Sequence, residues 1–329
     1  MKKSLIALAV LAASGAAMAQ SSVTVYGIAD IWFGSSKAGL NGVRQTVLES
    51  GGVSGSRFGF KGTEDLGGGL KANFLLEQGF SLDTGAASDS TKAFNRQAYV
   101  GLSGGFGEVK LGNVYTAYDD ISGATNSAFD SVLAAATNVF VSNGYTANPN
   151  NNIYYATPSF GGFSGAVSYG LGENKTTTLS AANTTAFHAK YENGPIYAGV
   201  AYQRQKPQGS GASDKFTRIN GSYDFGVAKL LASYGNVKED TGEKSNEYHI
   251  GVDVPLGGAL TLSGGYATSK TKLAGVTQSK RSGYGIALAY GLSKRTTVYT
   301  GVHSDTEKDG AGVKTDKNTA YAVGIKHTF

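Results

Sequence analysis

Most of the chain consists of short segments in which apolar residues alternate with small or polar ones, and this period of two predicts β-strands. Within 279–290, for example, Tyr284, Ile286 and Leu288 alternate with glycine and alanine. We find about sixteen such segments, each bounded by Gly, Asn, Asp or Pro. They cover residues 22–33, 56–64, 70–80, 94–102, 108–114, 152–157, 163–171, 184–192, 196–206, 215–225, 229–238, 245–254, 259–271, 279–290, 296–305 and 318–329.

The connections between these segments alternate in length. Short turns such as 65–69 and 104–107 alternate along the chain with long polar stretches such as 34–55 and 306–317. Tight turns at one end, longer loops at the other and an even strand number are typical of barrels in bacterial outer membranes. Lipid on one side and water on the other explain the alternation, although a water-soluble sheet with one buried face is an alternative. The pattern predicts an all-β fold, a 16-stranded antiparallel transmembrane β-barrel.

The last segment ends on an aromatic residue, with no tail after it. Counting back from Phe329, the apolar residues Ile325, Val323 and Tyr321 fall on one face of the strand. Such an ending fits a strand that closes a barrel against the first one, and we assign Phe329 and Tyr321 to barrel closure and assembly. Tyrosines near segment ends predict a membrane interface. These are Tyr26, Tyr99, Tyr169, Tyr202, Tyr223, Tyr234, Tyr266 and Tyr290.

One long segment, residues 115–151, neither alternates nor carries a helix-length apolar face. A connection of this length is normally functional or disordered. Its aromatic residues, among them Tyr115, Phe129 and Tyr145, argue against disorder because they need to be covered. We predict that this third loop folds into the barrel and narrows a water-filled lumen. The alternative is a long loop lying on the outer rim.

The first nineteen residues have the features of a cleaved secretory signal. Two lysines are followed by the apolar run 5–16 and by the small-x-small site Ala17-Met18-Ala19, so residues 1–19 are removed and one barrel domain, 20–329, remains. No later stretch is long and apolar enough for a membrane helix. The chain has no cysteine, although it is exported to where disulfides form. Without Lys2 and Lys3 its net charge falls from +5 to 5 − 2 = +3, which suggests no nucleic-acid partner.

Several motifs in matching order resemble the Gram-negative general diffusion porins, specifically the trimeric sixteen-stranded kind of the beta-proteobacteria. They are Val25-Tyr26-Gly27, the stretches 56–67, 69–72, 95–102 and 106–112, and the ending 323–329. The resemblance covers essentially the whole mature chain. It implies an outer-membrane channel for passive passage of ions and small hydrophilic solutes, without a cofactor. It also implies a homotrimer surrounded by outer-membrane lipid and lipopolysaccharide.

In such porins a ladder of wall arginines faces acids on the third loop. Carried over by position, Arg57 and Arg96 match two of these arginines. If Phe58 faces lipid, Arg57 faces the lumen. If Tyr99 faces lipid, so does Gln97, and Arg96 then faces the lumen. An arginine aimed at hydrocarbon costs about 2–4 kcal/mol at mid-depth. Three lysines share the inward phase of their strands and add positive potential. They are Lys61, Lys71 and Lys110.

The expected acids lie on the loop and on the wall. Asp119, Asp120 and Asp130 are the loop candidates, and Asp30 and Glu77 share the inward phase of their strands. Opposite charges across a narrow passage create a transverse field that orients polar solutes. For each lysine and acid, the alternative is a wet lumen residue without influence on selectivity.

Two positions depart from the porin pattern and limit the expected anion preference to a weak one. Tyr154 stands where related porins tend to have a further arginine, and Ile28 where some have a lysine. A sugar-specific channel is the nearest alternative, with Tyr154 and Tyr26 as its candidate lumen aromatics. A barrel enzyme is a more distant one, because the four histidines are scattered without metal-type spacing and no nucleophile motif is present.

Overall fold

The computed structural model describes residues 22–329, so the predicted signal peptide and the start at Gln20 lie outside the described residues. The chain forms one sheet of seventeen strands, all paired antiparallel with their neighbours. The strands are β1 (Ser22–Lys37), β2 (Gln45–Ser50), β3 (Arg57–Gly67), β4 (Leu70–Gly79), β5 (Gln97–Gly104), β6 (Gly107–Asn113), β7 (Asn152–Ala156), β8 (Phe163–Leu171), β9 (Asn183–Asn193), β10 (Ile196–Lys206), β11 (Asp214–Asp224), β12 (Lys229–Lys238), β13 (Glu243–Gly257), β14 (Leu260–Leu273), β15 (Val276–Gly291), β16 (Thr296–Asp309) and β17 (Lys314–Thr328).

Two of these strands share one place in the sheet. β2 pairs with the second half of β1 and β3 with its first half, so together they form a single position interrupted at residues 51–56. The predicted 16-stranded antiparallel barrel is therefore confirmed. β2 itself was not predicted, because it lies within the expected loop 34–55.

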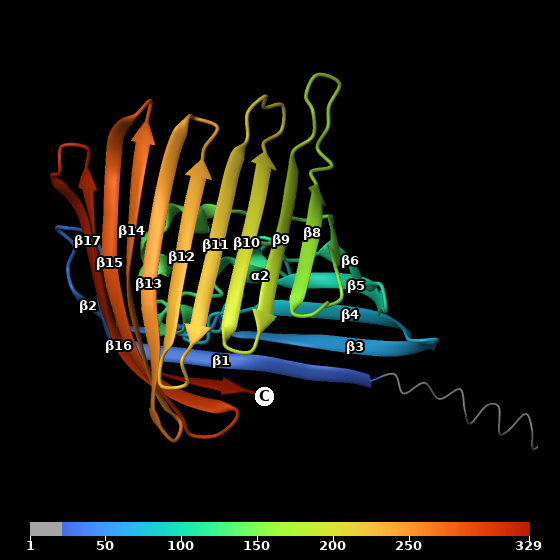
Figure 1. The fold of residues 1–329 in the computed structure, drawn as a ribbon, viewed down its shortest axis with the longest axis horizontal. Helices are drawn as coiled ribbons and strands as arrows, with labels where there is room; N and C mark the ends of the chain where they lie inside the picture. Colours follow the sequence, from blue (N-terminus) through green and yellow to red (C-terminus); the bar gives the residue numbers. More distant parts are fainter. Residues whose placement is uncertain (1–21) are drawn as a thin grey trace, which may run out of the picture.

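The barrel closes where the last strand meets the first. β17 pairs with β1 from Ile28 opposite Thr328 to Lys37 opposite Thr319. Beyond that ladder, the backbones of Gly27 and Phe329 exchange two hydrogen bonds of 3.1 Å. In Figure 1 the C-terminus accordingly lies beside β1.

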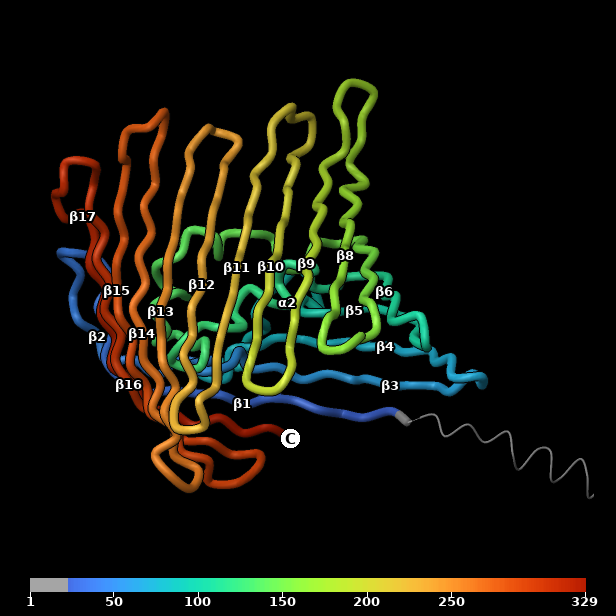
Figure 2. The backbone as a smooth tube through the Cα atoms, in the orientation of Figure 1, coloured from blue at the N-terminus to red at the C-terminus, as the bar shows by residue number. Residues whose placement is uncertain are grey.

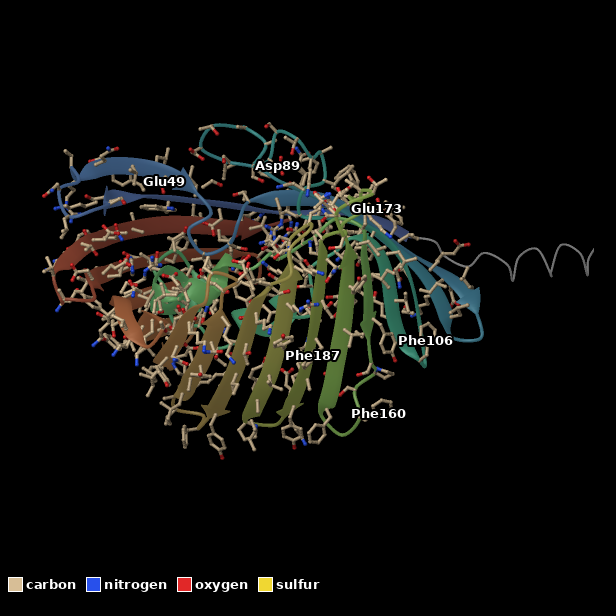
Figure 3. The ribbon with its side chains drawn as sticks, turned by 90° about the horizontal axis from the view of Figure 1, so that it is seen from above. Glu49, Asp89, Phe106, Phe160, Glu173 and Phe187 are labelled. Atoms are coloured by element: carbon tan, nitrogen blue, oxygen red, sulfur yellow. The ribbon has the colours of Figure 1, made fainter. Side chains whose placement is uncertain are left out.

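The long and short connections gather at opposite ends of the strands (Figure 2). Figure 3 shows Asp89 and Glu173 on the side of the long connections, and Phe106 and Phe160 on the side of the short turns. One expected long loop, 306–317, is mostly strand, since β16 runs to Asp309 and β17 starts at Lys314. Such extensions stand in water on both sides, so their sequence carries no apolar alternation.

The outer surface is apolar, as the alternation predicted. On β17, Tyr321, Val323 and Ile325 are 52%, 54% and 42% exposed, whereas Ala322 between them is buried. Two of the eight interface tyrosines were assigned wrongly. Tyr26 and Tyr99 point inward, because the Tyr26 hydroxyl donates to Glu77 and the Lys110 ammonium lies 5.3 Å from the centre of the Tyr99 ring.

The inside of the barrel holds the segment between β6 and β7, residues 114–151. It contains the short helices α2 (Asp119–Ser122) and α3 (Ala135–Val139) and the 3-10 turns η1 (Ala128–Asp130) and η2 (Val141–Gly144). These pack against β10 to β16, and in Figure 1 they lie behind those strands, in green. The third loop therefore folds inward, as predicted. Within residues 22–329, no helix has the length and apolar character needed to cross a membrane.

Candidate functional site

The inward loop follows one side of the barrel wall closely because small residues at several positions of that wall leave room for it. Ile121 and Leu133 of the loop are fully buried against it. The buried wall alanines come from β8, β9, β10, β14, β15 and β17, and they are Ala166, Ala186, Ala201, Ala267, Ala287 and Ala322. At Gly285 a Cβ atom would lie 1.8 Å from the Leu133 carbonyl oxygen, so only glycine permits this approach.

Polar groups of the wall also bind the loop, and the sequence interpretation missed them. Arg218 of β11, fully buried, donates to Ser142 Oγ at 2.8 Å and to Asn143 Oδ1 at 3.2 Å. Glu247 of β13 accepts from the backbone N–H groups of Val141 and Ser142, the latter at 3.2 Å. The signal was available, because a charged residue in the middle of a spanning strand has to point inward.

Two histidines of the wall complete this attachment. His188 Nδ1 lies 2.7 Å from the Ala117 carbonyl oxygen, and His249 Nε2 lies 2.9 Å from Ser127 Oγ. Both histidines were interpreted only as lacking metal-type spacing. In the structure they are buried partners of the loop backbone and hydroxyls, which fixes the path of the loop across the lumen.

The opposite wall carries the two predicted arginines and Glu77. Arg96 Nε forms an ion pair of 2.8 Å with Glu77 Oε1, and Glu77 also accepts from the Tyr26 hydroxyl at 2.8 Å. Arg57 donates to Gly55 O at 3.0 Å and to Ser54 Oγ at 2.6 Å. A Cβ on Gly55 would lie 3.6 Å from Arg96 Nη1, so both guanidinium groups meet at this residue.

Arg96 reaches the lumen for a different reason from the one predicted. Gln97 and Tyr99 face inward, and a regular strand would therefore turn residue 96 toward lipid. Arg96 instead precedes β5 in irregular backbone, where Asn148 of the loop donates to its carbonyl oxygen at 2.9 Å. The side chain is thereby free to turn back toward Glu77.

The three loop acids are hydrogen-bonded to neighbouring side chains. Asp119 accepts from the Tyr145 hydroxyl at 2.6 Å, and Asp120 from the Tyr154 hydroxyl at 2.7 Å. Burial raises the pKa of both carboxyl groups to about 6, against a partial opposing effect of the tyrosine hydrogen bonds. Within residues 22–329, neither acid lies within 4.0 Å of a lysine or arginine nitrogen, so the acids remain separate from the arginine wall.

Asp130 sits apart from this pair. Its carboxylate accepts from Asn126 Nδ2 at 2.7 Å and from Thr137 Oγ1 at 3.3 Å. Its backbone has φ of 51°, in the left-handed region that an aspartate tolerates better than most residues. Burial raises the pKa of the Asp130 carboxyl group as well.

Asp30 does not line the open passage, although its strand phase is inward. It is 0% exposed and accepts from the backbone N–H groups of residues 52–54 at 3.2, 3.0 and 2.7 Å. The Tyr299 hydroxyl donates to it at 2.5 Å. Asp30 therefore holds the 51–56 turn that separates β2 from β3. Ser54 of the same turn accepts a hydrogen bond from Arg57.

Replacing Asp30 by alanine is expected to lower the thermal stability of the barrel. The change leaves three backbone N–H groups in a buried place without an acceptor, at about 1–3 kcal/mol for each unsatisfied group. The measurement is the temperature at which the folded band in detergent converts to the unfolded one on a gel. Asp65→Ala is the control, because exposed Asp65 accepts from the Gly67 backbone of the same turn at 2.9 Å and from no other group in the described part of the chain. Equal melting of the two variants would contradict this role of Asp30.

The three predicted lysines lie on the same inner wall as Glu77. The Lys61 ammonium lies 4.9 Å from the centre of the Tyr26 ring. Lys110 forms an ion pair of 3.0 Å with Glu108 and lies over the rings of Tyr99 and Tyr154. Lys71 is exposed, near the turn that joins β3 to β4.

The closure residues Phe329 and Tyr321 lie at the seam of the barrel. The Phe329 ring occupies the space where a Cβ on Gly27 would sit, at 2.3 Å. Tyr321 stands opposite Ser35 of β1, and the Arg44 guanidinium lies 5.2 Å from the centre of its ring.

Comparison with known proteins gives matches over the whole chain. The family model described as "Gram-negative porin" matches residues 5–310. "Outer membrane porin protein 32" of Delftia acidovorans is 39% identical, and "Major outer membrane protein P.IB" of Neisseria meningitidis is 31% identical, each with 100% of both chains covered.

Among solved structures, the "Anion-selective porin from Comamonas acidovorans" matches with a TM-score of 0.80 at 31% identity, over 94% of this chain and 100% of that one. The trimer form of OmpT of Vibrio cholerae matches with a TM-score of 0.67 over 94% and 99%. At 13% identity it shares the fold alone.

Proposed function

We propose that this chain, which belongs to the Gram-negative porin family, forms a general diffusion pore in the outer membrane for ions and small hydrophilic solutes. One observation carries the proposal: the inward loop holds its acids across the lumen from Arg57 and Arg96. Charges of opposite sign on two sides of a narrow wet passage act on every solute that crosses it.

The pore is proposed to prefer anions weakly. Arg96 is paired with Glu77, whereas within residues 22–329 Arg57 is bound only by neutral groups. Three wall lysines add positive charge, and Asp119, Asp120 and Asp130 subtract from it. The 31% identical protein of Comamonas acidovorans is described as an anion-selective porin. This supports a preference for anions but not any particular strength of that preference.

Reconstitution in a planar bilayer tests both parts. A salt gradient is expected to give a reversal potential that favours chloride slightly. Sealed vesicles that stay closed to salt would contradict the pore, and a reversal potential favouring potassium would contradict only the preference. Liposome swelling without lipid hydrolysis separates a channel from the barrel-enzyme alternative.

The sugar-specific alternative requires a bare aromatic surface along the lumen. Tyr26, Tyr99 and Tyr154 do face inward, but Lys61 and Lys110 lie over these three rings. The hydroxyls of Tyr26 and Tyr154 are bound to Glu77 and Asp120. These charged neighbours favour general diffusion. We expect no saturable block of the current by an oligosaccharide.

A homotrimer, with outer-membrane lipid and lipopolysaccharide against the remaining outer surface, is proposed from family membership. Chemical cross-linking of the detergent-purified protein at low concentration is the test. A ladder that ends at three copies is expected, and a ladder that ends at one would contradict it.

Ion selectivity is expected to depend on pH with a midpoint near 6. Above this pH the Asp119 and Asp120 carboxyls, with pKa values of about 6, are charged, and below it they are neutral. Acidification from pH 7.5 to 5 should therefore strengthen the anion preference, as the reversal potential reports. Asp119→Asn with Asp120→Asn should abolish the change, whereas Asp89→Asn, in the exposed 80–96 loop, should keep it. A midpoint near 4 in the parent protein would show that burial does not raise these pKa values.

A further inference from the structure

A cavity lies on the inner wall, between the arginines and the short-turn end of the barrel. Its volume is about 560 Å³, within the range of small-molecule sites. Side chains of β1, β3, β4, β5 and β6 line it, among them Thr63, Asn73, Tyr99 and Ser103. Lys61 and Lys71 also line it, but Arg57 and Arg96 do not.

The strand register places three lysines around this cavity. Lys61 stands opposite Leu75 of β4, and Lys71 opposite Ser103 of β5. Lys110 of β6 stands opposite Gly101, which is itself opposite Asn73. Lys61, Lys110 and Lys71 therefore lie, in that order, at the levels of residues 75, 73 and 71 of β4. At about 3.3 Å per residue, the first and last levels are about 13 Å apart.

Two of these lysines are free to bind a ligand. Lys110 is already paired with Glu108, which also lines the cavity. Within residues 22–329, neither Lys61 nor Lys71 has a carboxylate oxygen within 4.0 Å. Asp65 stands opposite Lys71 in the register, but it accepts from the Gly67 backbone and does not line the cavity. The cavity is therefore positive.

The wall between the lysines is polar and already organised. Asn73 accepts from the Thr63 hydroxyl at 3.0 Å and donates to Ser103 Oγ at 2.8 Å. The Tyr99 ring closes one side, held under the Lys110 ammonium. Because Ser103 Oγ accepts from Asn73, its own O–H group remains available to donate to a carboxylate or phosphate oxygen between the two lysines.

We propose that this cavity is a binding site for small organic polyanions, molecules that carry two or more carboxylate or phosphate charges, and that it is reached from the short-turn side. The two ammonium groups stand on flexible four-carbon side chains and can turn toward one ligand that carries two or more anionic groups, whereas a monoanion binds only one of them. This inference rests on the proposed pore function. It adds to that function a binding site that polyanions entering from the short-turn side occupy before they reach Arg57 and Arg96.

Block of the chloride current in a planar bilayer tests this site. Citrate, with pyrophosphate in a second series, is added to one side and then to the other, and acetate at equal ionic strength is the monoanion control. Citrate should block at a lower concentration from one side, and acetate should not block. Lys61→Gln with Lys71→Gln should raise the half-blocking concentration about tenfold, the effect of about 0.7 kcal/mol from each charge.

The matched control removes two lysines at the same end of the barrel but away from the cavity. Lys229→Gln with Lys294→Gln, beside the turns before β12 and before β16, should leave the block unchanged. Equal block in the parent and the Lys61/Lys71 variant, or no block in the parent, would overturn the site while the open-channel conductance still supports the pore. Block by pyrophosphate alone would assign the site to phosphates, and block by both to polyanions generally. A protein that conducts nothing would instead contradict the proposed function.

Discussion

Replacing Gly285 by alanine is expected to push the inward loop away from the wall into the lumen and to lower the single-channel conductance. The new Cβ atom would lie 1.8 Å from the Leu133 carbonyl oxygen and 3.2 Å from the Ala135 nitrogen, both of which belong to backbone. Neither atom can move alone, so the segment around α3 has to shift away from β15. Overpacking of this kind costs about 1–3 kcal/mol. The loop is held by short helices and a few side-chain hydrogen bonds, so the loop moves and the barrel wall does not. Conductance in the same salt as the parent is the measurement.

Gly105→Ala is the control for this change. Gly105 lies in the short turn between β5 and β6, has no atom within 4 Å of the position its Cβ would take, and does not need a positive φ. It should leave the conductance unchanged. Protease cleavage within 114–151 provides a second measurement, because a displaced loop is cut and a seated one is protected. A Gly285→Ala pore with parental conductance and protection would show that the loop does not limit the passage.

Removing both wall arginines is expected to shift the selectivity of the pore toward cations. In Arg57→Ser with Arg96→Ser, Glu77 loses its partner and becomes an unpaired acid beside the passage. Two unit charges at about 4 Å in water interact by about 1 kcal/mol. An energy of this size changes the partition of an ion into the passage by a factor of about five. The reversal potential under a salt gradient should therefore change sign. Arg44→Ser with Arg295→Ser removes the same charge at the two ends of the barrel, where it should matter little. An unchanged potential in the wall variant would mean that other groups set the selectivity.

The sequence was sufficient for the barrel because lipid imposes its pattern on every strand that it touches. All sixteen predicted segments overlap with strands. The strand β2 was missed because its six residues, Gln45–Ser50, are too few for a clear alternation, and the ends of β16 and β17 were missed because they extend into water. Tyr26 and Tyr99 were misplaced for a related reason: a phenol is compatible both with a membrane interface and with a wet lumen beside a lysine.

The site was predicted less completely, because its geometry depends on contacts between distant segments. The rule that placed Arg57 inward applies equally to Arg218 and Glu247, and these two bind the loop. Asp30 shares the inward phase but is covered by the 51–56 turn, and the phase of a strand does not reveal what covers it. The small residues facing the loop alternate like any inward position, so only the structure shows that they make room for it.

The interruption between β2 and β3 has a consequence for how the polypeptide assembles. The Val132 backbone N–H of the loop donates to Gly52 O of the interruption at 2.9 Å, and Trp32 and Tyr299 belong to the same apolar cluster as Leu133. Trp32 is on β1 and Tyr299 on β16, the neighbour of the terminal strand. The surface that receives the loop around Leu133 is therefore complete only after the first and last strands have paired. We expect the loop to pack against the wall in the last step of folding, once the barrel has closed.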